Sequence, residues 1–372
     1  MAVGVAAALA VLTMAVTGVL LTYEAQIDRW ALRDYRADPP PGAAPLGLDE
    51  LLARVAGGPP AGRVASVALG RDPRDPAVVR LACGATVHVD RFTAERLGDG
   101  ETRTRRFLRT VLYVHRWLAL EGEQRIVGRT IMATANLAFL FLLASGLCLW
   151  WPRRGGRAAW RPALWFRRGL TGRARNFNWH NVIGFWSAVP LAVIVVSGAT
   201  ISYQWAADLV HRAAGDTPPF QTSPRSLPPA LEAALAAAPE PPDPAAPPVA
   251  LEALAARAAA GTTGWRTITI DLPASAREPV VVAVDRGTGR QPSESEDLLF
   301  DGATGELVGR AGYPTFSRGF QVRRWLRFAH TGEVYGVVGQ TVAGAVSLGV
   351  AVLVWTGLAM SWRRFLGSRG RR

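Results

Sequence analysis

The chain has 372 residues, 49% of them hydrophobic and 19% charged, with 42 basic and 29 acidic residues and a formal net charge of +13. This composition excludes a disordered or fibrous protein. A nucleic-acid-binding protein is also disfavoured, because every basic residue is Arg and the excess is confined to two places. Eight Arg lie between Pro152 and Asn178 and five follow Trp362, with no acid in either stretch.

In chain order, four stretches lack charged side chains over the roughly 20 residues that a bilayer crossing requires. They are Met1–Tyr23, Thr130–Pro152, Asn176–Ala207 and Val334–Trp362. The first stretch could be a cleaved signal peptide, but it lacks a basic start and a small-residue cleavage site, so we interpret it as a span. Because positive loops face the cytoplasm, both Arg clusters predict cytoplasmic N- and C-termini and two outward-facing segments.

The predicted organisation alternates spans with extramembrane segments. It comprises transmembrane helix 1 (1–23), an outer domain (24–129), transmembrane helix 2 (130–152), a basic cytoplasmic loop (153–175), transmembrane helix 3 (176–207), an outer region (208–333), transmembrane helix 4 (334–362) and a basic cytoplasmic tail (363–372).

Each outer segment combines a helical pattern with alternating strands, which is typical of a small α+β module. An Ala/Pro-rich stretch, Asp216–Pro248, predicts a semi-rigid connector before the second module, with one short helix at Pro229–Ala238. The helices are predicted at Leu48–Val55 and Leu251–Ala260, and the strands at Val64–Leu69, Val79–Val89, Thr267–Leu272 and Pro279–Asp285.

The chain also aligns with itself. Thr17-Gly18 in the first span matches Ser197-Gly198 in the third, and Ser145-Gly146 in the second matches Thr356-Gly357 in the fourth. In the outer segments, Asp90-x2-Thr93-x-Glu95 matches Asp301-x2-Thr304-x-Glu306. We therefore predict two copies of a span–outer domain–span unit. The position that matches His180 would be residue 0, so we expect the sequence to begin one residue too late to show a further histidine.

Histidines near a bilayer are costly unless they are paired or act as ligands. His115 and His330 precede the second and fourth spans on the outer side, whereas His180 opens the third span on the inner side. Two neutral imidazoles facing each other across a helix bundle can hold a haem iron. We predict one haem between His115 and His330 and a second at His180, with His211 as a weaker candidate and His88 as a solvated strand residue. The alternative is that these histidines are amphipathic anchors.

Several motifs resemble the PepSY-associated transmembrane family, and the resemblance covers nearly the whole chain. They are Thr-Gly-Val-Leu-Leu-Thr-Tyr-Glu (17–24), Ser-Gly-Leu-Cys-Leu-Trp-Trp-Pro-Arg-Arg (145–154), Trp-His-Asn-Val-Ile-Gly-Phe-Trp (179–186), Ile-Ser-Tyr-Gln-Trp-Ala (201–206) and His-Thr-Gly-Glu-Val-Tyr-Gly (330–336). The resemblance implies an α-helical membrane protein with four transmembrane helices and two PepSY-like periplasmic domains. It also implies haem b bound through His115, His180 and His330.

Members of the family include inner-membrane reductases of periplasmic ferric siderophores, which serve iron uptake. We therefore expect a haem-dependent reductase that receives electrons from a quinol or a cytoplasmic reductant, with membrane lipid as its surroundings. One alternative is a non-enzymatic PepSY membrane anchor that binds or restrains a secreted protein. Another is a cytochrome relay to a protein partner. Cys83 and Cys148 are expected to be buried thiols that form no disulfide.

Overall fold

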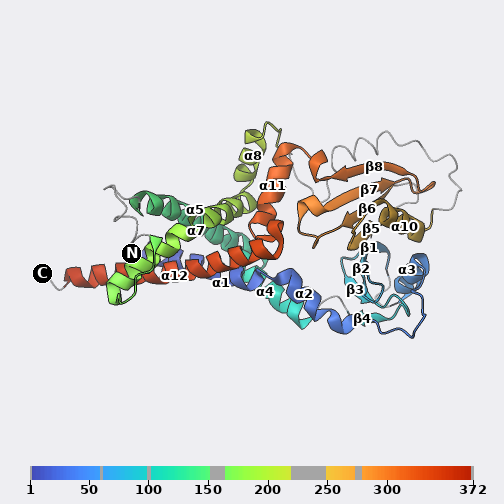
Figure 1. Cartoon of the computed structure of the whole chain (residues 1–372), viewed down its shortest axis with the longest axis horizontal. Helices are drawn as coiled ribbons and strands as arrows, with labels where there is room; N and C mark the ends of the chain where they lie inside the picture. Colours follow the sequence, from blue (N-terminus) through green and yellow to red (C-terminus); the bar gives the residue numbers. More distant parts are fainter. Residues whose placement is uncertain are drawn as a thin grey trace. The chain divides into compact units, whose positions relative to one another are not determined.

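A computed structural model of the chain describes residues 2–58, 62–98, 102–150, 164–218, 249–272 and 279–369. The chain divides into two compact units, and each is contributed by segments that are distant in sequence (Figure 1). The helical unit comprises Met1–Glu24, Phe107–Ala214 and Val322–Arg372, and the sheet unit comprises Ala25–Arg106 and Gly215–Gln321.

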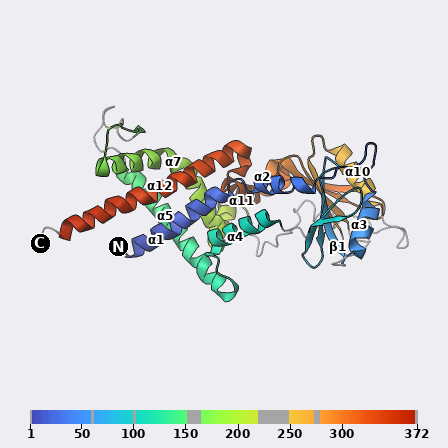
Figure 2. The ribbon, with the colours of Figure 1, turned by 90° about the horizontal axis from the view of Figure 1, so that it is seen from below.

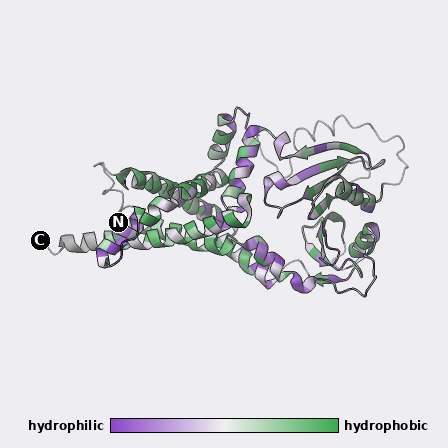
Figure 3. Cartoon of the chain, viewed as in Figure 1, coloured by the Kyte–Doolittle hydropathy of each residue, from purple (hydrophilic) through white to green (hydrophobic). Residues whose placement is uncertain are grey.

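The helical unit contains long apolar helices and shorter, more polar ones (Figure 3). Among the described residues, three helical segments are long and apolar enough to cross a membrane, and α1 together with the bent segment that follows it is a fourth candidate. The elements are α1 (Ala2–Leu21), α4 (Arg103–Trp117), η2 (Gly122–Gln124), α5 (Arg125–Trp150), α7 (Gly172–Ser202), α8 (Gln204–Ala213), α11 (Arg318–Ala329), η5 (Glu333–Tyr335) and α12 (Gly336–Arg369).

The long helices form a bundle in which α12 packs on both α1 and α7, and α5 packs on the same two helices. Helices α1 and α12 run side by side in two perpendicular views (Figures 1 and 2). The interior is closed by small and branched apolar residues, whereas large apolar side chains such as Phe141 (71% exposed) and Val189 (77% exposed) point outward. An apolar exterior around an apolar interior is what lipid surroundings require, so the protein is a membrane protein.

Helix α7, the third long helix, ends earlier in the sequence than predicted. Helix α7 ends at Ser202, Tyr203 is extended with φ −120° and ψ 127°, and α8 begins at Gln204. The expected continuous span to Ala207 is therefore interrupted at Tyr203. The carbonyl of Ser202, which this break leaves without a helical partner, accepts a hydrogen bond from Arg129 at 2.7 Å.

The sheet unit contains eight antiparallel strands in one continuous sheet, in the order β4-β3-β2-β1-β5-β6-β7-β8. The two segments expected as separate modules contribute four strands each, and they meet where Ser66 of β1 pairs with Asp271 of β5. The strands are β1 (Val64–Gly70), β2 (Ala77–Leu81), β3 (Thr86–Val89), β4 (Arg96–Gly98), β5 (Thr267–Asp271), β6 (Val280–Asp285), β7 (Ser295–Phe300) and β8 (Leu307–Gly312).

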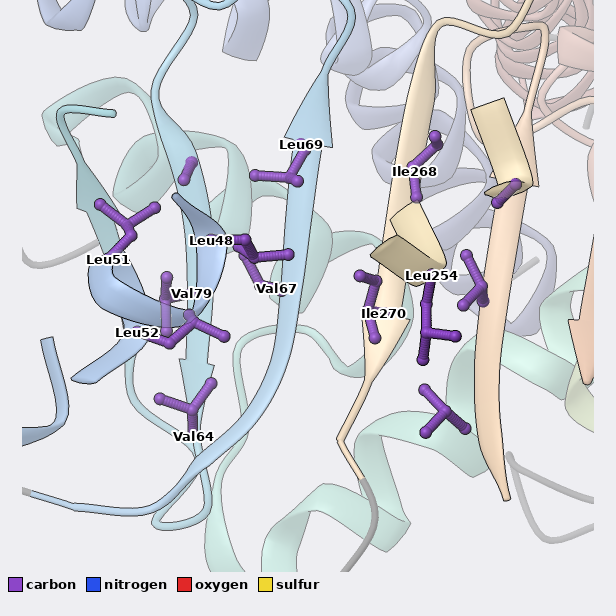
Figure 4. Close-up of a cluster of buried hydrophobic side chains, with 14 of the residues drawn as sticks. Leu48, Leu51, Leu52, Val64, Val67, Leu69, Val79, Leu254, Ile268 and Ile270 are labelled. Carbon is purple, nitrogen blue, oxygen red and sulfur yellow. The ribbon is translucent and has the colours of Figure 1, made fainter. Parts of the chain in front are cut away.

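Two amphipathic helices, α3 (Leu48–Gly57) and α10 (Leu251–Gly261), pack against this sheet and complete its core (Figure 4). Leu51 of α3 and Leu254 of α10 are fully buried against alternating strand residues such as Val67 and Ile270. The same alternation gives the sheet one apolar face along its length. The remaining elements are α2 (Glu24–Ala31), η1 (Arg33–Tyr35), η3 (Pro292–Glu294) and η4 (Tyr313–Thr315).

Two turns that match in sequence are also built alike. Asp90 Oδ1 accepts hydrogen bonds from the backbone N–H groups of Phe92 (2.6 Å) and Thr93 (3.1 Å), and Asp301 Oδ1 accepts them from Ala303 (2.8 Å) and Thr304 (2.7 Å). The backbone N–H of Thr304 holds the pKa of Asp301 below its ordinary value, because it stabilises the ionised carboxylate.

Some predictions fall on residues outside the described ranges. They concern most of the connector 216–248 with its short helix at Pro229–Ala238, the first arginines of the basic loop 153–175, and the arginine side chains that follow Trp362.

Candidate functional site

His115 and His330 lie close together in the helical unit. His115 is in the last turn of α4, His330 directly follows α11, and their ring centroids are 6.4 Å apart with an angle of 66° between the ring planes. Two short helices that precede different long helices thus bring one imidazole each to the same place. The pairing predicted from the sequence is present in the geometry.

The Nδ1 atom of each ring is held by a hydroxyl group of a long helix. Thr17 Oγ1 of α1 lies 2.8 Å from His115 Nδ1, and Ser197 Oγ of α7 lies 3.1 Å from His330 Nδ1. The carbonyl of Ile194 lies 2.9 Å from the same His330 Nδ1. A carbonyl only accepts hydrogen bonds, so His330 Nδ1 carries the proton and Nε2 carries the lone pair.

Glycines next to these hydroxyls let the rings approach the helix backbone. A Cβ atom at Gly18 would lie 3.7 Å from His115 Cε1, and one at Gly198 would lie 3.3 Å from His330 Cε1. The second contact is tighter than ordinary van der Waals packing. Glycine at position 198 therefore makes room for the imidazole.

Glycines in the long helices also allow close contact with the loops that follow the two histidines. A side chain at Gly128 of α5 would collide with the carbonyl of Trp117, and one at Gly339 of α12 would collide with the carbonyl of Gly332. Leu118 and Ala119, which follow α4, both have φ of 56°, in the left-handed region that non-glycine residues rarely adopt. The turn that follows His115 is therefore strained, and the surrounding fold must hold it in place.

Burial keeps the imidazoles of the pair neutral. Burial lowers the pKa of His115 to about 4, and the nearby charges of His330 and Arg116 act in the same direction. Burial likewise lowers the pKa of His330 to about 4. At neutral pH both rings are uncharged, the form in which imidazole binds a metal.

His180 lies in the first half of α7, away from this pair, and has the same kind of partner. Its Nδ1 lies 2.9 Å from Thr356 Oγ1 of α12, and a Cβ at Gly357 would lie 3.5 Å from its Cε1. Ser197 is 17 residues further along α7, which corresponds to about 25 Å of helix.

A cavity of about 940 Å³ adjoins His180 within the bundle. Its volume is within the range of about 300–1,000 Å³ that small-molecule and cofactor sites occupy. Its walls are mainly apolar and come from the four long helices, with Ser145, Gly146 and Gly357 among the small residues that line it.

Arg116, which follows His115, lies near the charges of three other arginines; we call the four the arginine cluster: Arg116, Arg125, Arg129 and Arg327. The guanidinium carbons of Arg116 and Arg125 lie 4.8 and 3.5 Å from the centroid of the same Trp117 ring. The pKa of Arg116 is lowered by burial and by the charges of the other three arginines. Like charges held this close favour binding of an anion.

The other predicted residues lie elsewhere. His211 is buried in the last turn of α8, where its role stays a prediction. His88, expected to be solvated, is 1% exposed in β3, so that prediction is wrong: the Tyr35 ring covers it at a centroid distance of 5.5 Å. Cys83 and Cys148 form no disulfide but are exposed rather than buried.

The sequence interpretation missed the partners of the histidines. It identified Thr17, Ser197 and Thr356 only as repeat markers, although the recurrence of a Ser/Thr-Gly pair in each long helix is a signal that side chains approach there. Among the described residues, no group of three or more His, Cys, Asp and Glu gathers around a common point that could hold a metal ion.

The comparison with protein families gives one match that covers almost the whole chain. The model of the PepSY-associated TM region matches residues 1–364. The chain belongs to this family, which confirms the resemblance drawn from its motifs. The comparison with curated proteins finds no match.

Proposed function

We propose that the protein is a haem b protein of the bacterial inner membrane that transfers electrons across the bilayer and reduces ferric siderophores in the periplasm, as a haem-dependent ferric reductase in iron uptake. The proposal includes cytoplasmic termini and a periplasmic sheet unit made of PepSY-like domains. The spacing of His115 and His330 is the observation that carries it.

The spacing fits one metal ion between the two rings. With metal–nitrogen bonds of about 2.0–2.1 Å, the two rings, whose centroids are 6.4 Å apart, would each reach a metal ion placed between them. The bound Nδ1 atoms leave Nε2 of each ring for the metal.

The residues of the chain have distinct roles in this proposal. His115 and His330 hold one haem, and His180 with the adjoining cavity holds a second. Gly18 and Gly198 let the imidazoles of the first pair sit against the helices. When bound, haem supplies a one-electron iron couple whose potential depends on its axial ligands and on the surrounding burial.

Two sites at different depths suit transfer across a membrane. His180 and Ser197 are about 25 Å apart along α7, most of a hydrocarbon core of roughly 30 Å. Arg167, Arg168, Arg173 and Arg175 precede His180 and support a cytoplasmic position for that end. A quinol or a cytoplasmic reductant would donate electrons there.

The arginine cluster supports an anionic acceptor at the other end. The positive-inside rule does not account for Arg116, Arg125, Arg129 and Arg327, because they lie beside the pair that faces the periplasm in this topology. The cluster would attract ferric siderophores whose carboxylate or catecholate oxygens give the complex a net negative charge. Reduction of Fe(III) to Fe(II) weakens binding to hard oxygen ligands, so the iron is released for uptake.

The test is a reduced-minus-oxidised visible spectrum of the purified protein, with haem quantified per chain, followed by anaerobic mixing of the reduced protein with a ferric siderophore. The proposal predicts haem b bands and their reoxidation by the chelate. Protein without haem would refute the proposal and favour a PepSY membrane anchor for a secreted protein. Bound haem that the chelate does not reoxidise would instead favour a relay to a protein partner.

A further inference from the structure

Three buried hydroxyls contact the three bundle histidines in the same way. Thr17, Ser197 and Thr356 lie in α1, α7 and α12 and are 8%, 0% and 1% exposed. Each is followed by a glycine, and each oxygen lies 2.8–3.1 Å from an Nδ1 atom, of His115, His330 and His180 respectively. The hydroxyl groups are buried and the three rings are half-buried, so access of water to these hydrogen bonds is restricted.

The direction of these hydrogen bonds follows from the remaining partners of the hydroxyls. A hydroxyl has one hydrogen. Thr17 donates it to the carbonyl of Thr13, Ser197 to that of Ile194, and Thr356 to that of Val352. With its hydrogen on the carbonyl, each hydroxyl oxygen accepts from its histidine, which is the arrangement with Nδ1 protonated; at His330 the Ile194 carbonyl requires this tautomer.

At His330 a backbone carbonyl gives the same answer independently. The carbonyl of Ile194, three residues before Ser197, lies 2.9 Å from His330 Nδ1 and can only accept a hydrogen bond. The glycine that follows each hydroxyl lies against Cε1 of the ring. The hydroxyl and the glycine together define the position of each imidazole.

We propose that Thr17, Ser197 and Thr356 are positioning residues that hold three histidines as Nδ1–H tautomers and direct Nε2 toward haem iron. This inference rests on the proposed function and deepens it. Partners of this kind orient metal-bound histidines in general, and their loss typically lowers metal affinity about 10- to 100-fold.

The same helices contain hydroxyl groups that donate hydrogen bonds to backbone carbonyls, and these residues provide matched controls. Thr13 of α1 donates to the carbonyl of Leu9 at 3.0 Å, and Thr200 of α7 donates to that of Ser197 at 2.8 Å. Removal of either hydroxyl changes a helix-internal hydrogen bond without touching an imidazole.

The experiment compares Thr17→Val, Thr17→Ser and Thr13→Val as full-length protein in detergent. Haem per chain, the rate of haem loss to apomyoglobin and the low-spin electron paramagnetic resonance signal of the oxidised protein are measured. We expect Thr17→Val to raise the haem-loss rate about 10-fold or more and to alter the low-spin signal. Thr17→Ser should restore both, and Thr13→Val should match the unmodified protein.

Ser197→Ala with Thr200→Val repeats the comparison at His330, in case Thr17→Val does not fold into monodisperse protein. If both position variants match their controls while haem is bound, the positioning role is refuted and the proposed function survives. If the unmodified protein binds no haem, the proposed function fails and the positioning role fails with it.

Discussion

The two ends of the helical bundle present histidine in different settings. At one end, His115 and His330 lie at the ends of α4 and α11, have ring centroids 6.4 Å apart and contact hydroxyl groups of α1 and α7. At the other, His180 has the same kind of hydroxyl partner, Thr356, and adjoins a cavity of about 940 Å³. The first end brings two rings together, whereas the second has a cavity beside one ring. The hydroxyl–glycine arrangement is common to both, so it belongs to how the bundle holds an imidazole.

The largest expected effect separates the two ends by removal of their ligands. If the proposed function holds, His330→Ala should abolish the haem signal of the His115–His330 end and leave that of the His180 end, and His180→Ala should do the reverse, because each would remove a proposed iron ligand. Reduced-minus-oxidised spectra with haem quantification measure this, with His88→Leu as a control in the sheet unit. Unchanged haem content in His330→Ala would contradict the assignment.

A smaller effect is expected from the turn that follows His115. Gly128→Ala would push a methyl group into the carbonyl of Trp117, so the turn must shift, at a cost of about 1–3 kcal/mol. The thermal unfolding midpoint should fall, and haem should be lost from the His115–His330 end first.

Ala119→Gly is the counterpart in the same turn. Glycine tolerates the φ of 56° at this position, so this variant should keep or slightly raise the unfolding midpoint. Equal midpoints for Gly128→Ala and the unmodified protein would show that the close approach is not required.

The arginine cluster distinguishes the ends through charge. Arg116→Gln should raise the KM for an anionic ferric siderophore about fivefold at low salt, which corresponds to roughly 1 kcal/mol for one charge near the surface. It should also weaken the dependence of the rate on ionic strength. Arg80→Gln, in an exposed position of β2, is the control. A KM that rises equally for a neutral chelate would exclude an electrostatic origin.

The smallest expected effect concerns His88, which lies in the sheet unit, whereas the candidate haem ligands lie in the helical unit. It tests whether burial is enough to identify a histidine as part of a functional site. His88 is buried in β3, and neither ring nitrogen has a hydrogen-bond partner among the residues that the structure describes. Burial lowers its pKa, so below the ordinary value near 6.5 the unfolded chain binds a proton that the folded chain does not. Stability from this group is therefore present above about pH 6.5 and is lost as the pH falls through that value.

His88→Leu should accordingly raise the stability of the sheet unit by about 1 kcal/mol, because it removes an unsatisfied buried polar group. It should also reduce the loss of stability between pH 7 and pH 5. Unfolding followed at both pH values measures this, and an unchanged pH dependence would show that His88 is hydrated in solution.

Much of the helical unit could be predicted from the sequence. Apolar runs predicted the long helices, and the matching positions of His115 and His330 predicted that they would meet. The hydroxyl partners were not assigned, because a Ser/Thr-Gly pair in an apolar helix usually serves close packing. The short distances from Thr17, Ser197 and Thr356 to the histidine rings show otherwise.

The sheet unit was less predictable. Local alternation gave β1 and β5, but nothing in either strand indicates that Ser66 pairs with Asp271. His88 was expected to be a solvated strand residue, yet η1 brings Tyr35 over it and it is buried. A contact made by a segment distant in sequence cannot be read from the periodicity of one strand.

The joint between β1 and β5 has a consequence for biosynthesis. Strand β5, the second partner of β1, is translated only after α5 and α7. The first four strands must therefore wait with an open edge at β1 while two apolar helices are inserted into the bilayer. An unpaired strand edge invites pairing with other chains. Completion of the sheet thus depends on successful membrane insertion, and chains that stall midway would be exposed to aggregation and proteolysis before they reach an assembled state.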